Sequence, residues 1–152
     1  MIGADDIMLL KGKIVIITGG TSGIGLAVSK RTLQEGGKIA ILHVNKNKDK
    51  NVIRELAKYE GKYKLYRCDI SNEDDVRKTF ENVFLDFGRI DCLVNSAGVA
   101  LENKPSREVT IDEWNKVISV NLTGVFLCTK YVIPYMIKKL IKQVRANLLQ
   151  PY

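Results

Sequence analysis

Residues 13–28 decide the fold, and they read KIVIITGGTSGIGLAV. Residues 13–18 are rich in Val and Ile, without strict polar alternation, as is typical of a strand buried on both faces of a parallel sheet. A glycine-rich turn follows, and beyond Gly23 the apolar residues recur at helical spacing. The stretch therefore predicts a strand, a tight turn and a helix in immediate succession.

The glycines of this turn have the spacing G-x-x-x-G-x-G. Gly19 can turn sharply out of the strand, Gly23 lets the backbone approach a pyrophosphate, and Gly25 allows the helix to pack closely on the sheet. The N–H groups and dipole of the helix start would hold phosphates, and the Thr21 and Ser22 hydroxyls could donate as well. A glycine-rich turn that binds no ligand has the same composition, so the glycines alone leave both interpretations open.

Three further apolar runs follow, at residues 38–43, 63–68 and 89–95, so that the four runs start 25, 25 and 26 residues apart. Segments of helical period separate them. This pattern predicts an α/β protein with a three-layer, doubly wound parallel sheet of about four strands in the order 3-2-1-4. An eight-unit barrel would need about twice as many residues.

The helical segments carry recognisable ends. Ser71-Asn72 is a predicted N-cap before the third helix, and Gly36-Gly37 a predicted stop after the first. The first helix is expected to turn Ile24, Ala27, Val28 and Leu33 inward. Thr110 and Glu113 form a predicted capping box that opens a long helix, which is apolar around much of its circumference and is expected to be buried or to pack on a partner. Its apolar residues are Trp114, Val117, Ile118, Val120, Leu122, Val125, Phe126 and Leu127.

The net charge of +7 is concentrated at one end, since residues 114–152 hold six basic residues and no acidic one. A basic tail alone is weak support for nucleic-acid binding, and we expect neither a nucleic-acid nor a membrane partner. One histidine and no Cys-x-x-Cys leave few zinc ligands, so no metal site is expected. Cys68, Cys92 and Cys128 are predicted to be buried, reduced thiols, which favours a cytoplasmic protein.

Four further motifs accompany the glycine turn in order: Asp69-Ile70, Asn95-Ser96-Ala97-Gly98, Trp114, and SVNLTGVF at residues 119–126. Together they resemble the short-chain dehydrogenase/reductase family, with Ser96 where the family usually has a second Asn. The resemblance covers about residues 11–137. It implies a Rossmann fold and an NAD(P)-dependent oxidoreductase that transfers hydride between alcohol and carbonyl groups.

The resemblance also implies site residues. The cofactor would contact Gly19, Thr21, Ser22, Gly23, Ile24, Gly25, Asp69, Ile70, Asn95, Ala97 and Gly98. Asn121 corresponds to the helix asparagine that holds a water in the family's proton relay; an amide that satisfies a helix kink is compatible with the same residue. His43, at the end of the second strand, would also contact the cofactor, and it starts a stretch without the carboxylate that would bind the ribose of NAD. This absence, with Lys46 and Lys48 nearby, favours NADP weakly over NAD, although both lysines also suit a solvated helix start.

The family's catalytic Ser and Tyr-x-x-x-Lys follow a fifth strand that these 152 residues do not show. Tyr135 and Lys139 match the second pattern formally, but they precede the place of that strand, and about 0.7 such pairs are expected by chance. We therefore expect residues 1–139 to form the NAD(P)-binding part and 140–152 a divergent basic tail. The chain alone is expected to be inactive, either a cofactor-binding fragment or a pseudoenzyme that binds a dinucleotide or a protein, with the helix at 111–137 as a candidate homo-oligomer contact.

Overall fold

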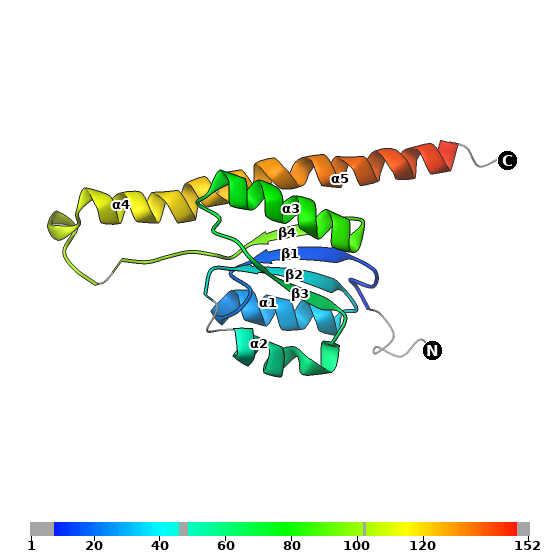
Figure 1. The fold of residues 1–152 in the computed structure, drawn as a ribbon, viewed down its shortest axis with the longest axis horizontal. Helices are drawn as coiled ribbons and strands as arrows, with labels where there is room; N and C mark the ends of the chain where they lie inside the picture. The colour runs from blue at the N-terminus through cyan, green and yellow to red at the C-terminus, as the bar shows by residue number, and fades with distance from the viewer. Residues whose placement is uncertain (1–7, 46–48, 102, 149–152) are drawn as a thin grey trace.

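The computed structural model of the protein describes residues 8–45, 49–101 and 103–148. Four strands form one parallel sheet in the order β3-β2-β1-β4: β1 (Ile14–Thr18), β2 (Lys38–His43), β3 (Tyr63–Arg67) and β4 (Cys92–Asn95). On one side of the sheet lie α1 (Gly23–Gln34) and α2 (Asp49–Leu56), and on the other α3 (Glu73–Phe87) and the long C-terminal helix (Figure 1). The predicted three-layer α/β/α fold and its strand order are confirmed.

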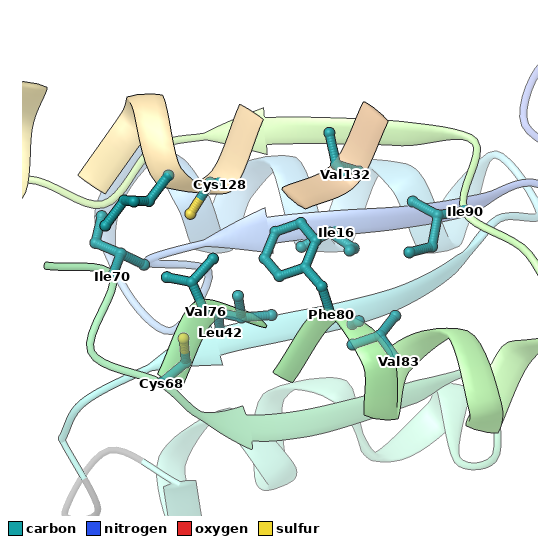
Figure 2. Close-up of a cluster of buried hydrophobic side chains, with 12 residues drawn as sticks. Ile16, Leu42, Cys68, Ile70, Val76, Phe80, Val83, Ile90, Cys128 and Val132 are labelled. Carbon is teal, nitrogen blue, oxygen red and sulfur yellow. The ribbon is translucent and has the colours of Figure 1, made fainter. Parts of the chain in front are cut away.

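The sheet separates two apolar cores because neighbouring strand residues point to opposite faces. Ile16 and Leu42 point to the face of the sheet that α3 and the long helix cover. Phe80 of α3 belongs to the same core and is fully buried (Figure 2). Val15 and Ile17 face α1 and α2 in the second core. Both faces of β1 are thus covered, which explains why its sequence shows no polar alternation.

Helix α1 buries only part of the face that was predicted: Leu33 is buried and Val28 packs on the core, but Ile24 and Ala27 do not point inward. Its buried residues are Gly25, Ser29, Thr32 and Leu33, whereas Ile24 is 79% exposed and Ala27 is also exposed. The Ser29 hydroxyl lies within hydrogen-bond distance of the carbonyls of Gly25 (2.9 Å) and Gly20 (3.2 Å). Small and hydroxyl side chains face the sheet because the helix backbone lies so close to the β1 turn.

The start of β4 also differs from the prediction, which placed it at residue 89. The Asp91 N–H donates to the Ile14 carbonyl at 2.9 Å, but the Ile14 N–H donates to the Asp91 carboxylate at 2.8 Å, and this carboxylate also pairs with Arg89 at 2.6 Å. A side chain thus takes the place of a backbone acceptor where the strand begins. β4 is an edge strand, and for that reason Cys92 is exposed and not buried as expected. Cys68 and Cys128 are buried as predicted.

Helix caps follow the sequence closely. Of the predicted N-cap pair Ser71-Asn72, it is Asn72 that caps α3, by accepting from the Asp75 N–H at 3.0 Å. The predicted capping box at Thr110 and Glu113 is present. Two short 3-10 turns, η2 (Ala57–Tyr59) and η3 (Ser106–Glu108), complete the connections in the described ranges.

The capping box opens a continuous helix made of α4 (Ile111–Ile118), a π-helical segment η4 (Ser119–Gly124) and α5 (Val125–Leu148). Leu127 packs in the core with Cys128 and Val132 (Cys128 and Val132 are drawn in Figure 2). Trp114, Leu122 and Phe126 are each more than half exposed, so the helix is not buried all round within this chain, and packing on a partner remains a prediction. Ile111–Lys138 is long and apolar enough to span a bilayer, but core helices of soluble proteins meet the same criteria of length and composition. Its contacts with α3 and the sheet make this segment part of the folded domain.

Candidate functional site

A cavity of about 640 Å³ lies at the carboxyl ends of the strands. Its walls come from the β1–α1 turn, the ends of β2 and β3, the loop after β4, and one side of α4 and η4. In open parallel sheets, ligands bind in the crevice outside the carboxyl ends of the strands. The position of the cavity is therefore that of a binding site, and its volume is in the range of cofactor pockets.

The glycine turn shapes one wall. Gly19 adopts φ +67°, and a Cβ there would lie 2.8 Å from the Ala97 Cα, so only glycine fits. A Cβ on Gly25 would collide with the Gly19 carbonyl oxygen. At Gly23, φ is +52° and the space where a Cβ would stand has no neighbouring group within 4 Å, so the backbone there is open to an approaching ligand. Glycine is thus required at each of the three positions for a different steric reason, as the spacing of the motif predicts.

The loop after β4 forms the facing wall and is tied to β1 by a single side chain. The Thr18 Oγ1 accepts from the backbone N–H groups of both Ser96 and Ala97 at 3.0 Å, and lies 3.5 Å from the Val94 carbonyl. Thr18 is completely buried. Because one hydroxyl joins the ends of two neighbouring strands, the turn and the loop are held at a set separation across the cavity.

Asp69 and Ile70 leave β3 at the third wall. One carboxylate oxygen of Asp69 accepts from both the backbone N–H (3.0 Å) and the hydroxyl (2.6 Å) of Ser71, which orients the side chain. Ile70 is buried against Gly124, where a Cβ would lie 2.8 Å from its side chain. Burial raises the pKa of the neighbouring Cys68 thiol to about 11, so this lining residue is neutral at physiological pH.

Asn121 lies in the π-helical segment η4 and holds the loop after β4 by two hydrogen bonds. Its side-chain oxygen accepts from the Val99 N–H, and its amide nitrogen donates to the Val99 carbonyl, both at 2.9 Å. Asn121 is not among the residues that line the cavity, whereas Val99 is. In this structure the Asn121 side chain positions the loop after β4. Its expected place in a proton relay remains a prediction.

The residues predicted to contact a cofactor all line this cavity except Asn95, which pairs with Thr18 inside the sheet. Sequence reasoning missed other lining residues, namely Leu42, Val44, Asn45, Cys68, Ser71, Ser96, Val99, Lys116, Ser119 and Val120. Lys116, Ser119 and Val120 follow the i, i+3, i+4 spacing of one helix face, but no local motif marks that face as part of the site. Lys46 and Lys48, named for cofactor choice, lie outside the described residues.

Tyr135 lies away from this cavity. Its ring packs on Phe84 of α3 with centroids 4.9 Å apart, beside the core, and burial raises its pKa. The structure thus agrees with the argument against Tyr135 and Lys139 as a catalytic pair; nothing is described of the Lys139 side chain. Among the described residues, no group of three His, Cys, Asp or Glu side chains could hold a metal ion.

Comparison with known proteins agrees with this geometry. The chain is 37% identical to the 3-oxoacyl-(acyl-carrier-protein) reductase of Thermotoga maritima over 132 residues, 87% of this chain and 53% of that protein. It is 37% identical to the sorbose reductase of Candida albicans over 84% of this chain and 46% of that protein. The chain thus spans about half the length of the curated relatives it matches.

Solved structures show the same likeness. An NAD⁺-bound xylitol dehydrogenase superposes with a TM-score of 0.81 at 32% identity, over 86% of this chain and 50% of that one. A metagenomic short-chain oxidoreductase in complex with NADP gives 0.78 at 30% identity, over 86% of this chain and 59% of that one. The family described as short chain dehydrogenase matches residues 13–146. The chain therefore belongs to the short-chain dehydrogenase family.

Proposed function

We propose that this chain binds NAD or NADP in the cavity at the carboxyl ends of its strands, as the cofactor-binding part of a short-chain oxidoreductase. The observation that supports this most is the glycine turn, in which Gly23 leaves open space where its neighbours Gly19 and Gly25 are tightly packed. Backbone N–H groups at the start of α1 would hold the pyrophosphate there. The dinucleotide would supply the hydride chemistry, and this chain's residues would bind and orient it.

Three parts of the cavity wall would each contact a different part of the dinucleotide. The Thr21 and Ser22 side chains line the cavity at the phosphate end, and Asp69 with Ile70 would contact the adenine. Ala97 and Gly98 would border the cofactor from the loop that Thr18 and Asn121 hold in place. In a longer form of the protein, alcohol or carbonyl compounds would be the substrates.

Titration calorimetry of the 152-residue chain with NADH and with NADPH tests this proposal. We expect binding of both, and absence of binding for both would refute it. Gly23→Val is the informative variant, because a β-branched side chain at φ +52° strains the backbone and would fill the space that the phosphate needs. Gly61→Val, at φ +77° and away from the cavity, is the matched control for backbone strain.

We propose that NADP binds more tightly than NAD. His43, Val44 and Asn45 line the cavity at the end of β2, and none of them carries the carboxylate that would repel a 2′-phosphate. An Asn45→Asp variant should reverse the preference by lowering NADPH affinity while NADH binding is kept or improved. Equal losses for the two dinucleotides would contradict this assignment.

We further propose that these 152 residues are inactive alone, because the only Tyr-x-x-x-Lys match among them, Tyr135 and Lys139, precedes the place of the fifth strand that the family's catalytic residues follow. Tyr-dependent turnover of an alcohol or ketone by the purified chain would refute this.

A second candidate is a non-catalytic protein that binds a partner or a second copy through the long helix, in a reducing, cytoplasmic setting. The exposure of Leu122 (63%) and Phe126 (61%) favours it, and light scattering of Phe126→Glu against the parent chain would test it.

A further inference from the structure

We infer that Lys116 is a further binding residue of this site, and that its ammonium group pairs with a phosphate of the bound dinucleotide. The inference rests on the proposed dinucleotide binding and adds a residue to it. Lys116 lies on α4, one helical turn before Ser119 and Val120, and all three side chains line the cavity. The i, i+3, i+4 spacing makes this one continuous face of the helix.

The charge balance of the cavity gives Lys116 its importance. Among the described lining residues, Asp69 carries a negative charge and Lys116 the only full positive one. A pyrophosphate brings two further negative charges into the same space, where Asp69 alone would repel them. Lys116 offsets the Asp69 charge, and the ammonium on its flexible stem can reach a phosphate as a point charge.

Lys116 is also available for such a contact. The ion pairs of the described residues engage Lys104 with Glu113 and Lys130 with Glu73, each at 2.6 Å, but none engages Lys116. Its backbone carbonyl accepts from the Ser119 hydroxyl at 2.9 Å within the helix, which leaves the side chain unconstrained by that bond. A lysine that borders a cavity and has no ion pair with a carboxylate of the described residues is suited to bind an anionic ligand.

Two phosphates of a dinucleotide are candidates. Asn121 fastens this helix to the loop after β4, which Thr18 ties to the end of β1, and Gly124 of the same helix contacts Ile70 after β3. The ends of β1 and β2 both lie between these two contacts. The pyrophosphate at the β1–α1 turn is the expected partner, because both cofactors carry it. NADH and NADPH share the pyrophosphate and differ in the 2′-phosphate, so the two cofactors distinguish the two positions.

The test is calorimetric binding of NADH and NADPH to the full chain and to Lys116→Gln, at low and moderate salt. We expect the affinity for both cofactors to fall about 3- to 10-fold in the variant and to depend less on salt. Lys116→Arg should restore most of the binding. Lys78→Gln is the matched control, because Lys78 is exposed on α3, has no ion pair among the described residues and does not line the cavity.

A loss for NADPH alone would support pairing with the 2′-phosphate, and a loss for both would support the pyrophosphate. Unchanged affinity of Lys116→Gln for both cofactors, with binding by the parent chain intact, would overturn the inference and leave the proposed function standing. If the parent chain binds neither cofactor, the proposed function fails and the inference fails with it.

Discussion

Replacing Gly25 by alanine should destabilise the protein, although alanine is the better helix former. A Cβ at this position would collide with the Gly19 carbonyl oxygen and lie 3.1 Å from the Gly20 Cα. These are backbone atoms of the turn, which cannot rotate away as a side chain would. Overpacking of this kind costs about 1–3 kcal/mol, against about 1 kcal/mol gained from helix propensity. The difference is about 0–2 kcal/mol, and because the clash is with backbone atoms we expect a net loss near its upper end, about 2 kcal/mol.

Urea unfolding followed by circular dichroism measures this change, with Ala27→Gly in the same helix as the control. Ala27 is exposed, so its replacement should cost only the helix propensity, roughly 0.5–1 kcal/mol. Propensity alone predicts opposite signs for the two variants, whereas the steric argument predicts that both lose stability. A Gly25→Ala protein as stable as its parent would refute the reasoning, and retained NADH affinity would show that the turn is not displaced.

Further predictions concern the edge strand, the acid range and the β4 loop. Cys92 should react first with a thiol reagent, because Cys68 and Cys128 are buried and burial raises their pKa values to about 11 and 12; equal labelling of all three thiols would contradict this. Lys104 and Thr110 lower the pKa of Glu113 from 4.5 to about 2. The stability that this carboxylate contributes is therefore present above pH 4.5 and lost as the pH falls toward 2, and urea unfolding of Glu113→Gln should show a weaker pH dependence in that window. Asn121→Ala should speed hydrogen exchange at the Val99 amide, and unchanged exchange would exclude the proposed hold on the loop.

Much of the fold follows from local sequence, because its signals are local. The β-branched run at residues 14–18 is buried on both faces, and Thr110 with Glu113 forms the helix cap that its spacing predicts. Leu33 and Val28 of α1 were found in the same way, but Gly25 and Ser29 on its inward face could not be. Hydrophobicity favoured Ile24, but close approach of the helix backbone to the β1 turn selects Gly25 and Ser29, which carry no apolar signal.

The cavity was predictable in the parts where a motif marks it. The glycine turn and Asp69 have sequence signatures, whereas Lys116 belongs to the wall only because a helix distant in the chain lies alongside the sheet and reaches past the ends of its strands (Figure 1). The late start of β4 has a similar cause. A carboxylate at Asp91 takes the place of a backbone acceptor, and strand propensity says nothing of such a substitution.

The buried Thr18 hydroxyl that joins the ends of β1 and β4 affects how fast a ligand binds and how much conformational entropy is lost on binding. Its three short-range contacts set the two sides of the cavity before any ligand arrives, so little ordering of the loop remains for the binding step. A preorganised site of this kind should capture its ligand in one kinetic phase, without a slow closing step. Thr18→Val keeps the shape but removes the oxygen, and would convert this rigid receptor into one that must first be assembled.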